Sequence, residues 1–411
     1  MTSSPSASSL PGVAAARALP RQLDLRETEH ARLVLSLYYF VAFGAVGLYL
    51  PFFATWLQGR GFFGWQMSAI MALLPACQLL SPTLIGMLSD RLGLRGKMMT
   101  FCAVVTATGL SVFGLSALLL QPLPFPWALC CMFAFTALRS PTIGLADVLA
   151  LEISTNYGRV RLWGSLGFMV SALVGGALMN PTHAFALPVT LAAYLWVLVI
   201  VSWFLPQVSR LPPRPARHDL VLLLQQHAYR GLLVTIGLIF ASFTAYDMCA
   251  TLRLRELAAS GTQIGLFWAI GTLSEVVLLF FSGDWLKQVG AGKLLAAACS
   301  VSVLRWLALA TLTDVSWVLA LQPLHAISFG LMWVSAMGVL KRETGQRGGA
   351  TAQGLFASSV ALGGTVGMSV WGSMYEAWGS WYVFVISAGV MALAVVSASR
   401  LIRLTSPDAR V

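Results

Sequence analysis

The stretch GMLSDRLGLRGK, residues 86–97, is a charged island between two long apolar runs. Four of its twelve residues are charged, whereas the run 67–88, which overlaps its first three residues, and the run 98–120 after it are almost entirely apolar. A bilayer core about 30 Å thick needs about 20 apolar residues for each spanning helix. We therefore expect this stretch to be a short polar turn that joins two membrane-spanning helices.

The same alternation of apolar runs and short polar breaks continues along the whole chain. The runs are continuous instead of alternating with polar residues, which excludes a β-barrel, and lipid then leaves the helix as the spanning structure. The sequence predicts an all-α membrane protein with twelve transmembrane helices, at 33–57, 67–88, 98–120, 127–150, 161–180, 184–205, 230–252, 263–282, 294–312, 316–340, 351–373 and 381–402.

Composition and charge agree with a polytopic membrane protein. Of 411 residues, 58% are hydrophobic and 10% are charged, and the mean hydropathy is +0.79. If the N-terminus is cytoplasmic, 21 of the 26 Lys and Arg residues fall in cytoplasmic segments. Three fall in periplasmic loops (Arg60, Arg253 and Arg255), and two lie inside predicted helices (Arg139 and Arg305). This is the positive-inside pattern. It explains the net charge of +11 without a nucleic-acid partner, and predicts a bacterial inner-membrane protein with both termini in the cytoplasm.

The chain divides into two halves around a proline-rich segment. We expect a cytoplasmic tail at 1–32, a six-helix bundle at 33–205, a cytoplasmic loop at 206–229, a second bundle at 230–403 and a tail at 404–411. The N-terminal tail lacks the apolar core of a signal peptide. Its first residues contain no acid, so a transit peptide remains an alternative. Related stretches end at Lys97 and Lys293, 196 residues apart, and Gly-Gly pairs recur at 175 and 363. An internal duplication of this kind is typical of transporters.

Small residues occupy matched places in the fifth and eleventh apolar runs. They are Gly164, Gly167, Ser171 and Gly175 in one, and Gly354, Ser358, Gly363 and Gly367 in the other. Small residues let helices pack closely. The pattern fits either static packing or contacts that slide during a conformational change.

The charged island also resembles a known motif. It is similar to the signature loop between helices 2 and 3 of the major facilitator superfamily, through Gly86, Asp90, Arg91, Gly93, Arg95 and Lys97. A degraded second copy, SGDWLKQVGAGK at 282–293, keeps Gly283, Asp284 and Lys293. The resemblance implies two bundles that rock around a central cavity, with the charges of the loop holding the outward-facing state closed on the cytoplasmic side.

Ionisable side chains inside the apolar runs are candidate functional residues, because charge in a membrane is costly. They are Arg139, Asp147, Asp247, Glu275, Arg305 and His325. Arg305 stays charged, and Glu275 and His325 lie at a similar depth. We expect Glu275 to balance Arg305, with His325 in the same polar cluster. Each residue has a structural alternative. Arg305 would reach the cytoplasmic face, Glu275 would belong to a static ion pair, and His325 would be a neutral histidine hydrogen-bonded in the core.

The sequence has an acid on its eighth predicted helix, an arginine on the ninth and a histidine on the tenth. This arrangement resembles that of proton-coupled symporters of the lactose permease kind, in which residues at these positions serve substrate binding and proton coupling. Two residues depart from that pattern: Ser328 replaces the proton-carrying glutamate, and Gln322 replaces a lysine. If protons are coupled here, another acid must carry them. The candidates are Glu275, Asp247 and Asp147.

Five further stretches resemble the phenylpropionate permease-like branch of the superfamily: YGRVRLWGSLGF (157–168), SEVVLLFFSGDWL (274–286), LRW (304–306), LQPLHAISFG (321–330) and LFASSVALGG (355–364). The resemblance implies proton-driven uptake of a small organic solute. Substrates of that branch include aromatic carboxylates, and nucleoside symporters are a neighbouring group.

In the first half, Asp147 and Arg161 are expected to pair. Arg161 matches an arginine that binds sugar in the lactose permease pattern, but Ile143 stands where that pattern has an acid, which disfavours a disaccharide. Arg139 is expected either to face the cavity and attract an anion or to pair with Asp147. The candidate substrate contacts are Arg139, Arg161, Trp163, Tyr246, Trp268, Gln322 and Trp333, although core packing is the alternative for each aromatic residue.

The sequence therefore predicts a monomeric secondary transporter, not an enzyme, that moves a small organic solute with protons by alternating access. An aromatic carboxylate is favoured because Arg305 and Arg139 could receive it. The alternatives are a nucleoside or sugar symporter and a proton-coupled drug or metabolite antiporter. We expect the proton gradient to be the energy source, without a cofactor. No Walker motif is present, and the six cysteines lack metal-ligand spacing.

Overall fold

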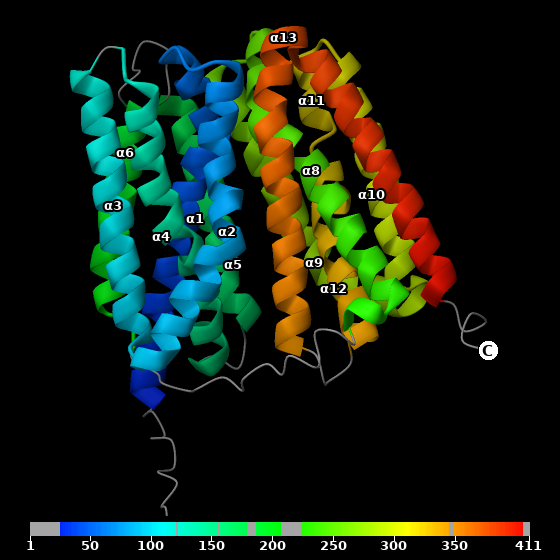
Figure 1. The fold of residues 1–411 in the computed structure, drawn as a ribbon, viewed down its shortest axis with the longest axis horizontal. Helices are drawn as coiled ribbons and strands as arrows, with labels where there is room; N and C mark the ends of the chain where they lie inside the picture. The colour runs from blue at the N-terminus through cyan, green and yellow to red at the C-terminus, as the bar shows by residue number, and fades with distance from the viewer. Residues whose placement is uncertain are drawn as a thin grey trace, which may run out of the picture.

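The computed structural model of the chain describes residues 25–120, 122–153, 157–178, 186–206, 223–344 and 349–405. Every regular element in these ranges is a helix (Figure 1). The first half contains α1 (Leu25–Gly59), α2 (Gly64–Leu92), α3 (Arg95–Leu119), α4 (Phe125–Ile153), α5 (Tyr157–Leu178) and α6 (Ala186–Trp203). These six helices coincide with the first six predicted spans, and α1 begins at Leu25, before the predicted boundary of the tail.

The second half contains α8 (His227–Glu256), α9 (Gly261–Val289), α10 (Ala291–Thr311), α11 (Val315–Ala320), the π-helix η1 (Ala326–Leu331), α12 (Met332–Thr344) and α13 (Gly349–Thr405). The short elements α11, η1 and α12 together occupy the tenth predicted span. The long helix α13 holds the last two spans, which turn back on each other at Gly379, where φ is 81° (Figure 1). Among the described residues, nine helices are long and apolar enough to cross a membrane. The all-α fold with twelve spans is confirmed.

Two helices continue through stretches that the sequence analysis treated as loops. The helix α2 runs to Leu92 and ends at Gly93, whose φ of 64° is left-handed and whose N–H donates to Ser89 O, as glycine often does at a helix end. The helix α9 runs on to Val289 and ends at Gly290, where φ is 90°. The expected loop across 283–293 was therefore wrong, because charged residues end an apolar run without ending the helix. The segments 1–24, 207–222 and 406–411 lie outside the described residues, so the expected tails and central loop stay predictions there.

The two halves repeat one close helix contact. In the first half, a Cβ at Gly167 would lie 2.0 Å from the carbonyl oxygen of Phe40, so that α5 rests directly on α1. In the second half, a Cβ at Gly363 would lie 2.1 Å from the carbonyl oxygen of Gly237, and α13 rests on α8 in the same way. Gly167 and Gly363 are 196 residues apart, the same offset as between Lys97 and Lys293. The structure thus supports the internal duplication and gives these two glycines a static packing role.

Replacing Gly363 by alanine is expected to lower the stability of the protein. The new Cβ meets a backbone oxygen, which cannot rotate away, so α8 and α13 must separate at a cost of about 1–3 kcal/mol. A melting curve of the purified protein in detergent measures the effect. The control is Gly354→Ala on the same helix, where a Cβ meets nothing within 4 Å. Equal melting temperatures for the two variants would contradict the packing role.

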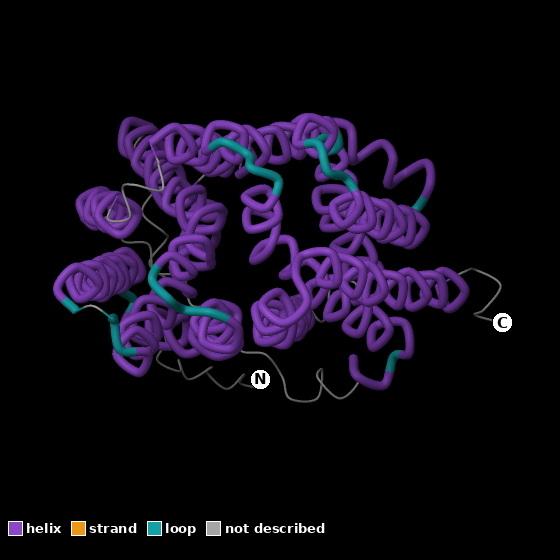
Figure 2. The backbone as a smooth tube through the Cα atoms, turned by 90° about the horizontal axis from the view of Figure 1, so that it is seen from above, coloured by secondary structure: helices purple, strands orange, loops and turns teal. Residues whose placement is uncertain are grey.

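The two halves meet along α5 and α9, α2 and α13, and α1 and α8. Seen along the helices, they form two groups side by side (Figure 2). We call the side at which α1 begins and α13 ends the termini side, and the opposite side the far side (Figure 1). On the far side the halves touch through backbone: a Cβ at Gly176 would lie 2.4 Å from the oxygen of Gly261, and one at Gly372 would lie 2.9 Å from the oxygen of Gly64. The structure is therefore closed on the far side.

Towards the termini side, α5 and α9 part. A groove of about 490 Å³ opens between them, bordered mostly by apolar side chains, with Arg159, Ser165 and Thr272 as the polar ones. Its apolar lining and the exposed leucines around it place it on the outer surface of the bundle.

Candidate functional site

Arg305 is the centre of a buried polar cluster in the second half. It lies 14 residues into α10, about 21 Å along the helix axis, and is 1% exposed. Its Nη1 donates to Ser328 Oγ and lies beside His325 Nδ1, both at 3.1 Å, and its Nη2 donates to Gln322 Oε1 at 2.9 Å. The guanidinium is thus held from one side by three uncharged groups.

All three partners come from the break in the tenth span. Gln322, His325 and Ser328 are three residues apart, at the point where α11 ends and η1 begins. Pro323 lacks the N–H that a continuing helix would use, and π-helical turns are frequent at functional sites. The expectation of one unbroken helix over 316–340 was wrong, because the apolar pattern continues through the break.

Aromatic rings cover the rest of the guanidinium. Its central carbon lies 4.4 Å from the ring centroid of Tyr246 and 5.2 Å from that of Trp306, positions that favour a cation–π interaction. The Tyr246 hydroxyl also donates to Gln322 Oε1 at 3.3 Å, and the His325 ring stacks on Tyr246. Tyr246 and Gln322 were expected to contact substrate, but each is 1% exposed and both are engaged with Arg305.

The expected ion pair between Glu275 and Arg305 is not formed. Within the described ranges, Glu275 makes no hydrogen bond or ion pair, and the cation whose charge acts on it is Arg161, from the other half. Glu275 lies midway along α9 and packs against Gly330. A Cβ added at Gly330 would lie 2.9 Å from the Cγ of Glu275. The acid whose charge acts on Arg305 is Asp247. The sequence placed Glu275 near the middle of its helix, as the structure does. It did not predict that the Glu275 side chain does not meet Arg305.

A second polar cluster lies in the first half, around Asp147. Its carboxylate accepts hydrogen bonds from Tyr39 at 2.5 Å and Tyr157 at 2.9 Å, and lies 3.7 Å from Arg161 Nε. The Arg161 guanidinium stacks 4.2 Å from the ring centroid of Phe43. The expected pair is present, and the side chains of its acid and base are about one-third exposed. The two tyrosines were not among the predicted site residues, although Tyr157 precedes Arg161 by one helical turn.

Arg139 lies apart from both clusters. The expected pair with Asp147 is absent, and the Arg139 guanidinium makes no hydrogen bond or ion pair with any residue that the structure describes. It borders an enclosed cavity of about 10 Å³ inside the first half. This space is too small for an organic solute, so the structure does not support Arg139 as a substrate contact.

The three tryptophans proposed as substrate contacts have different surroundings. Trp163 is 46% exposed and borders the outer groove between α5 and α9. Trp268 is buried, donates to Thr251 Oγ1 at 3.1 Å and meets the ring of Phe168 across the two halves. Trp333 is 37% exposed and packs among phenylalanines at the start of α12. Of the three, only Trp268 joins the two halves near Tyr246.

The signature loop forms an ion pair of its own. Asp90 and Arg95 lie 2.9 Å apart, with Arg95 buried at the start of α3 and Arg91 exposed. A Cβ at Gly86 would meet nothing within 4 Å, so the structure shows no close contact that requires this glycine. The side chain of Asp284, in the second copy, lies outside the described residues.

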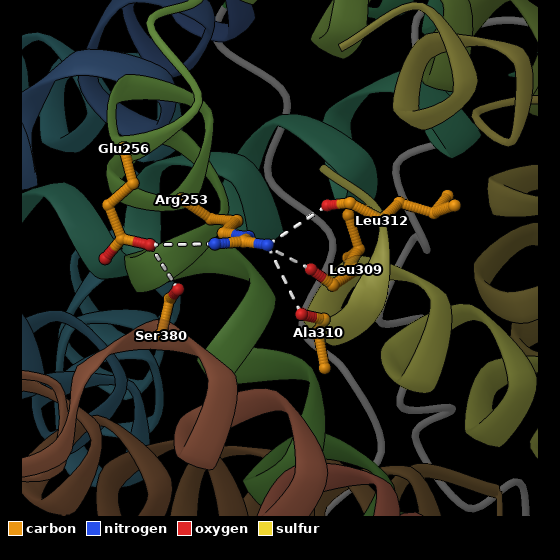
Figure 3. Close-up of polar contacts among 6 residues, drawn as sticks. All are labelled: Arg253, Glu256, Leu309, Ala310, Leu312 and Ser380. Atoms are coloured by element: carbon orange, nitrogen blue, oxygen red, sulfur yellow. Dashed lines mark hydrogen bonds and ion pairs between the residues drawn. The ribbon is translucent and has the colours of Figure 1, made fainter. Parts of the chain in front are cut away.

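On the far side, Arg253 ties three helices of the second half together (Figure 3). Its guanidinium donates hydrogen bonds to the last carbonyls of α10, which a helix end leaves without partners. It also pairs with Glu256 at 3.1 Å, and Glu256 in turn accepts a hydrogen bond from Ser380 on α13. The carbonyls belong to Leu309 at 3.2 Å, Ala310 at 3.3 Å and Leu312 at 3.0 Å. From its place in the sequence, Arg253 was expected only as a charge outside the membrane.

Comparisons with known proteins agree on a family and a fold. Residues 32–386 match the MFS_1 like family. The chain is 26% identical over 346 residues to the probable 3-phenylpropionic acid transporter of Escherichia coli K12, covering 81% of this chain and 87% of the relative. It is 28% identical over 372 residues to the maltose permease of Geobacillus stearothermophilus, covering 85% and 90%.

Among solved structures, the nucleoside transporter NupG superposes with a TM-score of 0.77, covering 91% of this chain and 99% of that one. The identity is 17%. At this level the likeness concerns the fold alone.

Proposed function

The chain belongs to the MFS_1 like family of major facilitator superfamily transporters, and we propose that it takes up a small organic acid in symport with protons. The proposal rests on one observation above all. Glu275 is an acid without a hydrogen-bond partner among the described residues, midway along α9, and the cation that acts on it belongs to the other half of the protein.

That arrangement makes the charge of Glu275 depend on the conformation. A nearby cation favours the carboxylate, whereas a dry site without the cation favours the neutral acid. When the halves rock, α5 and α9 change their relative position, and the distance between Glu275 and Arg161 changes with it. Proton binding and conformation are then linked, as symport requires.

Arg161 is the best candidate for holding the carboxylate of the solute. Arg305, first expected in this role, is enclosed by its own partners, and Arg139 borders a cavity of about 10 Å³. Arg161 is one-third exposed and stacks over Phe43 and Tyr39. A guanidinium binds a carboxylate through paired hydrogen bonds, and the rings beside it suit an aromatic solute. The relative named as a probable 3-phenylpropionic acid transporter supports this class.

The positive charges support an orientation. Arg91 and Arg95 lie where α2 meets α3, Arg159 opens α5, Lys293 opens α10 and Arg400 lies near the end of α13. All these helix ends are on the termini side. By the positive-inside rule we place this side in the cytoplasm of a bacterial inner membrane, so the structure represents an inward-facing state.

Proteoliposomes with the purified protein test the proposal. Under an inward proton gradient we expect accumulation of 3-phenylpropionate, abolished by a protonophore, with proton uptake on addition of the solute. Maltose and uridine, tested in parallel, distinguish the sugar and nucleoside alternatives. Accumulation that is unchanged by the protonophore would exclude proton coupling. Release of protons from the vesicles in exchange for solute would indicate an antiporter.

Replacing Arg161 by lysine is expected to weaken solute binding. Lysine keeps the charge but cannot form paired hydrogen bonds with a carboxylate, so we expect the KM for uptake to rise about tenfold, the effect of losing one charge-assisted hydrogen bond. Initial uptake rates over a range of solute concentrations measure it. The control is Arg159→Lys, two residues earlier on the same helix and facing the outer groove. An unchanged KM in Arg161→Lys would exclude its role in binding the carboxylate.

A further inference from the structure

The Asp147 carboxylate gathers three donors on one of its two oxygens. Tyr39 on α1 donates to Oδ1 at 2.5 Å, Tyr157 on α5 donates to the same oxygen at 2.9 Å, and Arg161 Nε lies 3.7 Å from it. The first two distances are those of hydrogen bonds, whereas the third is too long for one. Asp147 is therefore held by two phenols, and Arg161 lies beside it as a neighbouring charge.

This arrangement limits how Arg161 can bind Asp147. A carboxylate oxygen offers about two lone-pair sites, and the phenols occupy both sites on Oδ1. An arginine binds a carboxylate most strongly through two parallel hydrogen bonds, one to each oxygen. Because the oxygen that faces Arg161 is already occupied, this paired geometry does not form.

The Tyr157 hydroxyl also has a hydrogen-bond contact with the Arg161 side chain. It accepts from the base while it donates to the acid, and so stands between the two charges. A guanidinium has five N–H donors. The contacts with Asp147 and Tyr157 therefore leave donors of Arg161 for a further carboxylate.

Aromatic rings hold the plane of the same guanidinium. Its central carbon lies 4.2 Å from the ring centroid of Phe43 and 5.3 Å from that of Tyr39, and these two rings stack on each other along α1. Tyr39 thus contacts the acid through its hydroxyl and the base through its ring. Because Tyr39 is fully buried, it can influence a bound solute only through Arg161.

We propose that Tyr39 and Tyr157 are positioning residues for solute binding: by occupying Asp147, they keep Arg161 from closing onto that acid and leave its guanidinium for the carboxylate of the solute. The inference rests on the proposed role of Arg161 in binding the solute. It explains why an acid 3.7 Å from Arg161 does not take its paired hydrogen bonds. Without the phenols, Asp147 and the solute would compete for one guanidinium.

Removing either hydroxyl is the first test. In Tyr39→Phe and in Tyr157→Phe the ring stays, but one lone-pair site on Asp147 becomes vacant, so Arg161 can bind the acid directly. We expect the half-saturating concentration of 3-phenylpropionate to rise about tenfold, the order of one hydrogen bond to a charged group, at an unchanged maximal rate. Counterflow in proteoliposomes measures both quantities and requires no proton gradient.

The second test removes the competing charge. Tyr39→Phe/Asp147→Asn should regain nearly the half-saturating concentration of the parent protein, because a neutral amide does not compete for the guanidinium. A merely structural hydroxyl would not be replaced by a second loss in the same cluster. The matched control is Tyr49→Phe, also on α1, whose buried hydroxyl donates to the sulfur of Met71 at 3.9 Å; its half-saturating concentration should not change.

Two results would overturn the proposal. One is an unchanged half-saturating concentration in both Tyr39→Phe and Tyr157→Phe. The other is a defect in Tyr39→Phe that Asp147→Asn does not relieve.

A measurement without solute keeps the test independent of the proposed substrate. If the parent protein shows no counterflow of 3-phenylpropionate, the proposed substrate is wrong, and melting temperatures decide about the tyrosines. Arg161→Gln should lower the melting temperature by a few degrees more in Tyr39→Phe than in the parent protein, because Asp147 binds Arg161 closely only after it has lost a phenol. Equal losses in the two backgrounds would mean that the Tyr39 hydroxyl does not keep the base from the acid.

Discussion

Glu275→Gln should abolish accumulation of the solute against a gradient while leaving exchange of the solute across the membrane intact. Glutamine has nearly the shape of a protonated glutamate, so the variant resembles the proton-loaded state permanently. The two halves can then still rock with solute bound. They can no longer couple that motion to proton release, because the group that responds to Arg161 is gone.

The experiment compares two assays on the same proteoliposomes. Uptake driven by a proton gradient should fall by at least about 100-fold, the order expected when a positioned proton-transfer group is lost, whereas counterflow with solute on both sides should stay near the parent rate. Glu29→Gln, at the exposed start of α1, is the control for a change of charge. Full gradient-driven accumulation in Glu275→Gln would contradict its role. If Asp247→Asn is uncoupled in its place, Asp247 carries the proton.

The number and depth of the spans could be predicted from sequence because both follow from length. An apolar run of about 20 residues fixes a crossing, and the rise of 1.5 Å per residue fixes the level of a buried charge. The motif at 86–97 added the family, which is confirmed. The pair of Asp147 with Arg161 was also predicted correctly, since an arginine at the start of α5 can reach the neighbouring helix.

The partner of Glu275 could not be predicted, for a physical reason. In a soluble helix the polar face shows which side is buried, but a helix surrounded by lipid and protein is apolar all round. The sequence therefore carries the depth of Glu275 and not its direction. The break at Gln322–Leu331 was hidden in the same way, because the residues of the π-helix are as apolar as those of a regular span.

Ser328 and Gln322 show what a departure from a family pattern can and cannot tell. Neither residue carries a charge where the lactose permease pattern has one. The structure adds that both bind Arg305 directly. The uncharged replacements thus satisfy the hydrogen bonds of the guanidinium without neutralising it, and Asp247 is left as the acid that acts on it.

Arg305→Met should therefore be the most destabilising single change in the second half. It removes the donors that Gln322 and Ser328 bind, and it leaves Asp247 in the membrane without a compensating cation. Leaving the buried oxygens of Gln322 and Ser328 without their donor alone costs about 1–3 kcal/mol for each group. We expect a loss of folded protein and of transport, measured by the melting temperature and by uptake. Arg342→Met, on an exposed side chain at the end of α12, controls for the loss of a positive charge.

The double variant Arg305→Met/Asp247→Asn separates electrostatics from packing. If Asp247 compensates the charge of Arg305, removing both charges should recover a clear part of the stability lost in Arg305→Met, since the two effects are not additive for coupled groups. Transport should not return, because the cluster that holds His325 and Tyr246 is still missing its centre. A double variant no more stable than Arg305→Met would mean that the guanidinium acts through its hydrogen bonds and ring contacts alone, and that Asp247 is free to serve the proton.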